Sequence, residues 1–296
     1  MASRPPSAVL EAFGVKDPLR PLSGGRGLCF EADGIVLRPS DDEAESEWVG
    51  SFILLLETSC SNAVYRLPRP VRSNGDAPSF VHGGWTASAF LAGHTASPIP
   101  WQQTIQVCRQ FHTDVRALNI PKPAFLATRS DRFHEADLVT WDEKSLSHVD
   151  KVNKEMLAVV EPALSRIRKL KRPIPDGTPN QIIHGDLTGN MLFDGSAHAT
   201  SCLPPGIIDM TVYWRPAVYA KAIIIADGLI CHGQGGDLLD LYGFDEGRLQ
   251  LLVRALYWRC LCFAIDPDME FVRAYLPKMD FAGAVRILRD TRKRLA

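Results

Sequence analysis

The chain has 296 residues, of which 46% are hydrophobic and 23% are charged. A chain of this length can bury a large core and form two lobes. The 33 Lys and Arg nearly balance the 34 Asp and Glu, so bulk charge gives no reason to expect nucleic acid as a partner. The seven cysteines have no metal-type spacing, which indicates reduced thiols and a cytoplasmic location.

The sequence also gives no reason to expect membrane attachment. The N-terminal residues lack the apolar stretch of a signal peptide. The longest apolar run, at 220–230, is interrupted by Lys221, Asp227 and Gly228, and it is too short to span a bilayer.

The N-terminal third has the pattern of a β-rich region with one long helix. Asp33-Gly34 between two apolar runs is typical of a hairpin turn. Residues 40–43, Ser-Asp-Asp-Glu, resemble a capping box that opens a helix. The expected elements in chain order are a helix at 6–13, a glycine-rich loop at 23–27, strands at 28–32 and 35–38, a helix from 43 to about 58, and a second hairpin from 68–73 and 80–91.

After a linker at 92–94 the pattern becomes helical. Apolar residues recur at spacings of three and four in five segments, at 101–118, 151–171, 217–232, 246–264 and 281–294. The last segment ends in a cluster of cations: Arg286, Arg289, Arg292, Lys293 and Arg294. Cations are favoured at a helix C-terminus by the helix dipole, and we interpret the cluster in this way rather than as a nucleic-acid site.

One segment carries most of the chemical information. Residues 181–193 read Gln-Ile-Ile-His-Gly-Asp-Leu-Thr-Gly-Asn-Met-Leu-Phe, and residues 206–209 read Gly-Ile-Ile-Asp. A short apolar strand followed by His184, Asp186 and Asn190, and then a second strand that ends in Asp209, suits phosphoryl transfer from a nucleotide. One carboxylate orients the substrate hydroxyl, while an Asn and a second Asp hold Mg²⁺ on the phosphates.

This segment resembles the catalytic loop of the aminoglycoside phosphotransferase-like family, which has a protein-kinase-like fold. The resemblance covers residues 20–230. It implies an α+β, bilobal fold with a small antiparallel β-rich N-lobe containing one helix, at 1–91, and a large, mainly helical C-lobe, at 92–296. It also implies ATP as the cofactor, with GTP possible, together with Mg²⁺ and a small molecule as the hydroxyl acceptor.

The resemblance assigns roles to individual residues. Asp186 corresponds to the catalytic base, and Asn190 and Asp209 correspond to the metal ligands. In the N-lobe, the nucleotide site would comprise Gly24, Gly25, Gly27, Val36, Arg38, Glu45 and Leu91. Arg38 stands where the family has a phosphate-binding Lys, on the same strand face as Val36. We expect Glu45 to lie in the apolar arc of its helix formed by Trp48, Phe52, Leu55 and Leu56, and to pair with Arg38.

Residues around the loop receive structural roles. His184 is expected to brace the loop by hydrogen bonds, and His112 to be structural. Asp227, alone in an apolar helix face, is expected to brace the loop as well, by binding backbone N–H groups. Arg215 in the segment 213–216 either contacts the substrate or the loop, or the segment is a packing unit in which Pro216 begins a helix.

Two functions remain open on these residues, and a protein kinase is a weaker third, because the chain has neither a His-Arg-Asp nor an Asp-Phe-Gly motif. The first is an ATP- and Mg²⁺-dependent phosphotransferase acting on a small-molecule hydroxyl. The second is a catalytically weak or inactive pseudoenzyme that senses nucleotide or acts as a scaffold, motivated by Arg38 in place of Lys and by three residues, rather than the family's four, between Asp186 and Asn190. The C-terminal acids alternate with Arg248, Arg254 and Arg259, so the sequence does not specify an aminoglycoside as acceptor.

Overall fold

The structure is a computed structural model that describes residues 4–22, 27–60, 63–149, 152–175, 177–195 and 203–295. It divides into two compact units. Unit 1 comprises residues 1–99, 113–119 and 189–210, and unit 2 comprises residues 100–112, 120–188 and 211–296.

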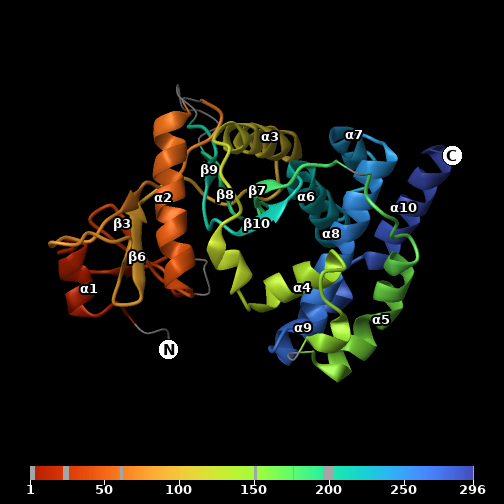
Figure 1. Cartoon of the computed structure of the whole chain (residues 1–296), viewed down its shortest axis with the longest axis horizontal. Coiled ribbons are helices and arrows are strands. Elements are labelled where there is room, and N and C mark those ends of the chain that lie inside the picture. Colours follow the sequence, from red (N-terminus) through yellow and green to blue (C-terminus); the bar gives the residue numbers. More distant parts are fainter. Residues whose placement is uncertain are drawn as a thin grey trace. The chain divides into compact units, whose positions relative to one another are not determined.

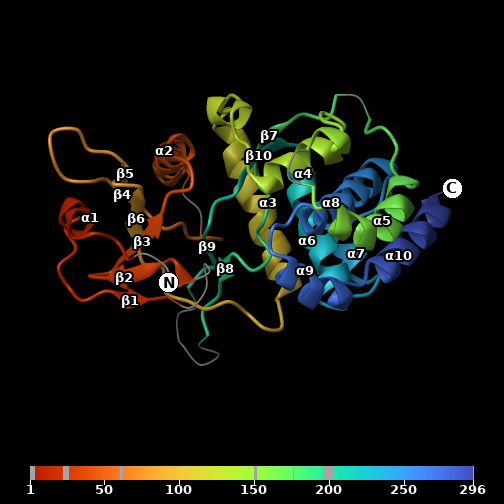
Figure 2. The same ribbon diagram turned by 90° about the horizontal axis from the view of Figure 1, so that it is seen from below.

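Unit 1 is built on an antiparallel sheet (Figures 1 and 2). Its strand order is β1 (Arg20–Pro21), β2 (Phe30–Ala32), β3 (Ile35–Pro39), β6 (Trp85–Ala89) and β4 (Pro70–Val71), and β5 (Val81–His82) also pairs with β6. The hairpin expected at Asp33-Gly34 is present between β2 and β3. Both turn residues adopt left-handed backbone angles, with φ of +54° and +74°, which the Asp-Gly sequence tolerates.

One face of this sheet forms the core of unit 1. Helix α1 (Ser7–Ala12) and the residues that follow it place Val9 and Phe13 in a buried cluster with Leu37 and Trp85. Because side chains alternate along a strand, β3 presents its other residues, Val36 and Arg38, on the opposite face.

Helix α2 (Glu43–Ser59) begins where the sequence predicts, and Phe52 and Leu56 of the expected apolar arc are buried. The Asp42 carboxylate caps it by accepting a hydrogen bond from the Glu45 N–H. Leu55, expected in the buried arc, is 45% exposed, whereas Gly50 is buried so tightly that a Cβ there would lie 2.4 Å from the Phe80 ring.

One carboxylate of α2 binds the backbone at the start of β5. The Glu47 carboxylate accepts hydrogen bonds from the Val81 N–H, at 2.9 Å, and from the Ser79 hydroxyl. Glu47, expected to point away from the packed face, is therefore bound there, and Glu45, expected on that face, is half-buried. A second, two-stranded sheet in unit 1 consists of β8 (Met191–Leu192) and β9 (Gly206–Ile207).

Unit 2 is mainly helical, with one antiparallel pair of strands, β7 (Gln181–His184) and β10 (Val212–Arg215). Its helices are α4 (Arg132–Thr140), α5 (Lys154–Arg168), α6 (Ala217–Cys231), α7 (Leu238–Tyr242), α8 (Glu246–Ala264), α9 (Met269–Tyr275) and α10 (Phe281–Leu295), and α3 (Trp101–Ala117) runs through residues of both units. All five helical segments expected from periodicity are present, whereas α4, α7 and α9 were not predicted. They are short, at five to nine residues, and give little periodic signal.

Helices α6 and α8 form the centre of unit 2. They pack against each other, α5 and α4 also pack on α8, and α10 packs on both α6 and α8. Every residue of α6 from Tyr219 to Ile230 is buried, including Lys221 and Asp227. Among the described residues, no helix is both long enough and apolar enough to cross a membrane.

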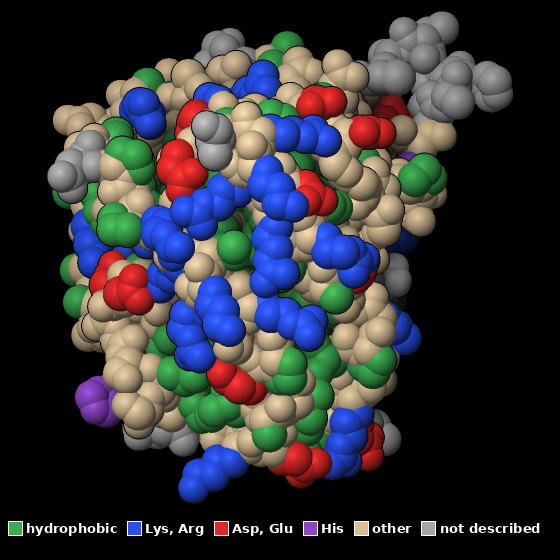
Figure 3. All heavy atoms as spheres, turned by 90° about the vertical axis from the view of Figure 1, so that its right-hand side faces the viewer, with side chains coloured by type: hydrophobic (Ala, Val, Ile, Leu, Met, Phe, Trp, Pro, Cys, Tyr) green, Lys and Arg blue, Asp and Glu red, His purple; other side chains and the backbone are tan. Residues whose placement is uncertain are grey.

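The outer face of α5 and α10 is strongly basic. Exposed cations on it include Arg166, Arg168, Arg286, Arg289 and Lys293. Figure 3 shows Lys and Arg side chains gathered over this end of the molecule, with few acidic side chains between them.

Candidate active site

The strand pair β7–β10 positions the His-Gly-Asp segment. Every residue of β7 is buried, and His184 pairs with Val212 at the end of the ladder. The Gly185 N–H continues the ladder by donating to the Thr211 carbonyl at 2.9 Å. The chain therefore leaves the strand at Asp186, whose side chain is 36% exposed.

Glycine at position 185 has a packing reason. A Cβ built there would lie 2.3 Å from the ring of Tyr213, which is far inside van der Waals contact. Tyr213 is itself 2% exposed and packs edge-on against Trp258 of α8. Tyr213 therefore packs directly against the loop backbone, which supports the packing interpretation of the 213–216 segment.

Two histidines brace the loop: His184, which was expected to do so, and His112. The His184 Nδ1 accepts a hydrogen bond from the Asp186 N–H at 3.2 Å. The His184 N–H in turn donates to Nε2 of His112 at 3.1 Å, and His112 Nδ1 lies 2.6 Å from the Cys108 carbonyl. These partners require a neutral His112 with its proton on Nδ1. Burial lowers the pKa of His112 to about 4, helped by the neighbouring His184, so this form persists at neutral pH.

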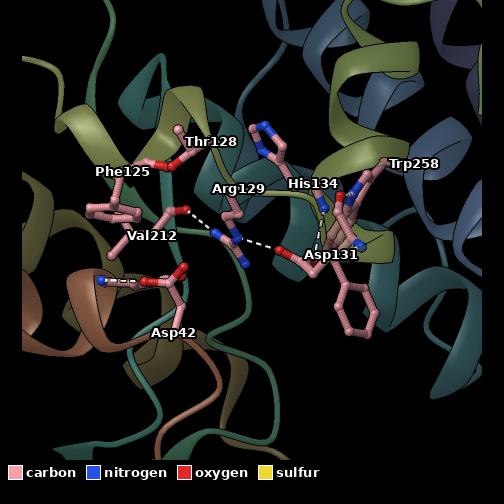
Figure 4. A network of polar contacts seen from close by, with 10 residues as sticks. Asp42, Phe125, Thr128, Arg129, Asp131, His134, Val212 and Trp258 are labelled. Carbon is pink, nitrogen blue, oxygen red and sulfur yellow. Dashed lines mark hydrogen bonds and ion pairs between the residues drawn. The ribbon is translucent and has the colours of Figure 1, made fainter. Parts of the chain in front are cut away.

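A network around Arg129 supports the same strand pair from behind (Figure 4). Arg129 Nη1 donates to the Val212 carbonyl of β10 at 2.7 Å, and its Nε pairs with Asp131. The Asp131 carboxylate also caps α4 through the N–H groups of Phe133 and His134. The network ties β10 to the start of α4.

Arg215 belongs to the support of this region and not to its exposed surface. Its guanidinium is buried and makes two hydrogen bonds to Asp137 of α4, at 2.6 and 3.0 Å, and it also pairs with Glu143. Pro216 precedes the first turn of α6. Within unit 2, the packing interpretation of this segment therefore holds for Arg215 as well.

Asp186 is held by an arginine that the motif did not reveal. Arg259 of α8 donates from Nη2 to Asp186 Oδ1 at 2.6 Å. The same Nη2 donates to Asp227 Oδ2 at 2.7 Å, and Nε donates to Asp227 Oδ1 at 2.6 Å. Asp227 is thus connected to the loop through the Arg259 side chain, and not through the backbone N–H groups that were expected.

Burial and charge oppose each other in this triad. Burial raises the pKa of Asp227, while the Arg259 guanidinium pulls it back down. Burial would lower the pKa of Arg259, but the carboxylates of Asp227 and Asp186 outweigh it and raise that pKa well above the ordinary value. Arg259 is therefore a permanent cation beside Asp186.

In unit 1, the other motif residues gather at one end of the small sheet. The Ile208 N–H donates to the Asn190 carbonyl at 3.0 Å, so Asn190 and Asp209 lie at the same end of β8–β9. Asp209 has a left-handed backbone, with φ of +52°, which is uncommon outside glycine and costs conformational energy. Gly189 also has a positive φ, +85°, as the short loop requires.

Arg38 meets this pair of residues. Its Nη1 forms an ion pair with Asp209 Oδ1. Within the described chain, Asp209 rather than Glu45 is the carboxylate that Arg38 pairs with, so the expected Arg38–Glu45 pair is wrong.

The donor set of Asn190 and Asp209 fits a Mg²⁺ ion. Mg²⁺ prefers oxygen ligands and is commonly held by one or two protein groups, with phosphates and water completing its shell. An amide oxygen and a carboxylate meet this requirement. The described residues contain no cluster of three or more His, Cys, Asp or Glu side chains, so a metal held wholly by protein groups of these types is not indicated there.

The remaining residues assigned to the nucleotide have mixed outcomes. Gly24 and Gly25 lie outside the described residues. Gly27 has φ of +71°, and no atom lies within 4 Å of the place its Cβ would occupy. Val36 and Arg38 share a strand face, Glu45 lies in the first turn of α2, and Leu91 packs beside Gly206 of β9.

Three supporting residues were missed or left unassigned by sequence reasoning. Arg259 lies 73 positions after Asp186, and Arg129 lies 83 positions before Val212. His112 lies 72 positions before His184. The one local signal was a cation inside the largely buried helix α8, which needs a carboxylate partner.

Comparison with known proteins identifies the fold. No protein-family model matches the sequence, and no curated protein matches it. The structure is similar to a microcompartment-associated aminopropanol kinase, with 15% identity, 98% of each chain covered and a TM-score of 0.60. It is also similar to a spectinomycin phosphotransferase solved with ADP and spectinomycin, with 15% identity, 96% of this chain and 97% of that chain covered, and a TM-score of 0.55.

A further similar structure is an aminoglycoside phosphotransferase from Alicyclobacillus acidocaldarius, with 14% identity, 100% of this chain and 97% of that chain covered, and a TM-score of 0.52. These likenesses confirm the kinase-like α+β fold that the sequence predicted. At such low identity they are likenesses of fold.

Proposed function

We propose that this protein transfers the γ-phosphoryl group of ATP to a hydroxyl of a small molecule. The observation that carries the proposal is the pairing of the two expected metal ligands in unit 1. Asn190 and Asp209 lie at one end of β8–β9, and Asp186 precedes Asn190 by only four positions. The shared fold supports the proposal, since the similar structures are small-molecule phosphotransferases.

Asp186 acts as the catalytic base in this proposal. The acceptor oxygen attacks the γ-phosphorus, the bond from that phosphorus to the β–γ bridging oxygen breaks, and ADP leaves. The hydroxyl proton passes to the Asp186 carboxylate. Asn190 and Asp209 would hold Mg²⁺, which when bound neutralises charge on the β- and γ-phosphates.

The nucleotide would lie on unit 1. Backbone N–H groups of the glycine-rich loop, which contains Gly24, Gly25 and Gly27, would approach the phosphates. Val36 and Leu91 would contact the nucleotide base, and Glu45 would complete the nucleotide site. GTP is an alternative to ATP as the nucleotide. Arg38 would exchange its pairing with Asp209 for the α/β-phosphates, which suits the bidentate geometry of a guanidinium.

One observation favours a second function. Arg38 neutralises Asp209, the carboxylate proposed to hold the metal. If that ion pair persists when nucleotide binds, the protein would sense nucleotide, or serve as a scaffold, without turnover. The six described cysteines are free, which suits a reducing compartment and supports a cytoplasmic location for either function.

The deciding experiment compares thermal stability and turnover. A ligand that binds only the folded state stabilises it by about 2.7 kcal/mol at one hundred times its Kd. We expect the melting temperature to rise with Mg–ATP, but not with ATP in EDTA, and the rise to vanish in Asp209→Asn. Asp186→Asn should keep the nucleotide shift while kcat falls by roughly 10²- to 10⁴-fold.

The outcomes separate the two functions. A Mg²⁺-dependent shift without phosphorylation of any hydroxyl compound would favour the nucleotide sensor. The absence of any shift with either Mg–ATP or Mg–GTP at millimolar concentration would exclude both functions.

A further inference from the structure

Arg259 has donors left over after it binds the two carboxylates. Nε and Nη2 carry all its hydrogen bonds to Asp227 and Asp186. Nη1, with two N–H groups, makes no hydrogen bond within the described part of the chain. It is also not among the buried side-chain atoms there that lack a hydrogen-bond partner, so it is accessible to solvent. The side chain keeps 18% of its surface exposed. A rigid pair of donors therefore faces solvent next to Asp186.

The guanidinium is fixed in this position. Asp227 grips it through two hydrogen bonds and is 4% exposed, and the guanidinium carbon lies 4.6 Å from the centre of the Trp258 ring. A planar guanidinium held in this way is pre-organised to bind a carboxylate or phosphate group.

The other buried carboxylates of unit 2 offer nothing to a cationic acceptor. Besides Asp227, the buried acids among its described residues are Asp137 and Asp266. Asp137 is bound by Arg215, and Asp266 is bound by Arg132. An amine arriving at Asp186 would meet the positive charge of Arg259 and no buried carboxylate that lacks an arginine partner.

We propose that the acceptor is a small hydroxylated anion, and that Nη1 of Arg259 binds its carboxylate or phosphate group while its hydroxyl lies at Asp186. This inference rests on the proposed phosphotransferase function. Because Nη1 and Nη2 belong to one guanidinium, the anionic group and the hydroxyl must be close together, as in a short hydroxy acid or a phosphorylated short alcohol. This acceptor class differs from aminopropanol, the amino alcohol named for the similar kinase.

A matched three-carbon series tests the proposal. The compounds are glycerol, glycerate, glycerol 3-phosphate and 3-amino-1,2-propanediol, which share a hydroxylated chain and differ in charge. Binding is measured by calorimetry in the presence of Mg–ADP. We expect at least tenfold tighter binding of glycerate or glycerol 3-phosphate than of glycerol, and weaker binding of the amine. The two anions distinguish a carboxylate from a phosphate as the preferred group.

The variants isolate Arg259. Arg259→Gln alone would leave Asp227 buried without a partner, so the test variant is Arg259→Gln with Asp227→Asn. It should bind the anions no better than glycerol. Asp227→Asn alone keeps the Nη1 donors and should retain the preference for anions, so it controls for the loss of the Asp227 charge.

Four results would overturn the acceptor assignment. In the wild type, these are tighter binding of the amine than of the anions, or no binding of any compound. In the double variant, they are an anion preference that survives, or a loss of Mg–ATP affinity, which would assign Arg259 to the nucleotide. Because binding is measured separately from turnover, the two proposals can fail independently. If the anions bind in an Arg259-dependent way but are not phosphorylated, the phosphotransferase proposal fails and the anion-binding assignment stands.

Discussion

Gly185 lets the Tyr213 ring pack directly against the backbone of the His-Gly-Asp loop. The Tyr213 ring occupies the space in which any larger residue would place its Cβ, at 2.3 Å. Gly185→Ala must displace either the ring or the loop, and overpacking of this kind costs about 1–3 kcal/mol. We expect a loss of unfolding free energy of that size in urea denaturation. Gly235→Ala is the matched control, because nothing lies within 4 Å of its Cβ position, and it should unfold like the wild type.

His112 predicts how stability depends on pH. Its folded pKa is about 4, against an ordinary value of 6.5, and the residue is buried. The stability that neutral His112 contributes is complete above pH 6.5. It falls as the pH drops toward 4, because the unfolded chain binds a proton that the folded chain does not. The difference in pKa corresponds to about 3 kcal/mol.

The measurement compares the wild type with His112→Gln, by urea denaturation at pH 7 and pH 4.5. The wild type should lose more unfolding free energy between these values than the variant, in which this group no longer titrates. Equal losses in both proteins would show that His112 does not stay neutral in the folded state.

At the scale of elements, a buried ion pair joins β10 to α4. Arg215 and Asp137 are 8% and 4% exposed at their side chains, and burial raises the pKa of Asp137 despite the arginine. Arg215→Met would leave the Asp137 carboxylate buried without its partner, which typically costs about 3–5 kcal/mol. Adding Asp137→Asn removes that charge and should recover part of the loss. A single variant within about 1 kcal/mol of the wild type would contradict this account.

Sequence reasoning succeeded where the signal is local. The Asp33-Gly34 hairpin follows from turn chemistry, and five helices follow from apolar spacing. The end of β7 at His184 was also readable, because an apolar strand stops at a polar motif. Each of these signals lies within a few residues of the feature that it predicts.

It failed where a contact joins distant segments. Helix α2 is apolar over much of its surface, so the sequence could not show that Leu55 is exposed and that Gly50 lies against Phe80. Asp209, the partner of Arg38, lies 171 positions away in the sequence. Arg259 reaches Asp186 only because α8 packs against α6, which carries Asp227. No local pattern records such packing.

At the scale of the whole molecule, charge is unevenly distributed. The segments 154–172 and 281–295, which contain α5 and α10, carry eleven Lys and Arg against three Asp and Glu, a net charge of +8. The whole chain has a net charge of −1, so the remaining residues carry −9. The cations of α10 were interpreted from the sequence as a helix end. The packing of α10 against α5 brings them beside those of α5 in a single basic face (Figure 3).

This asymmetry predicts chromatographic behaviour that the overall isoelectric point, near 6.7, does not. A dense cationic face binds a polyanionic surface locally even when the net charge is slightly negative, and added salt screens the attraction. We expect retention on a sulfonate cation exchanger at pH 7.5. Replacing Arg286, Arg289 and Lys293 with Gln should lower the salt needed for elution more than replacing Lys16, Arg69 and Arg72, three exposed cations of unit 1. Both triple variants lose the same charge. An equal effect would therefore show that total charge, and not the clustering on α10, governs binding.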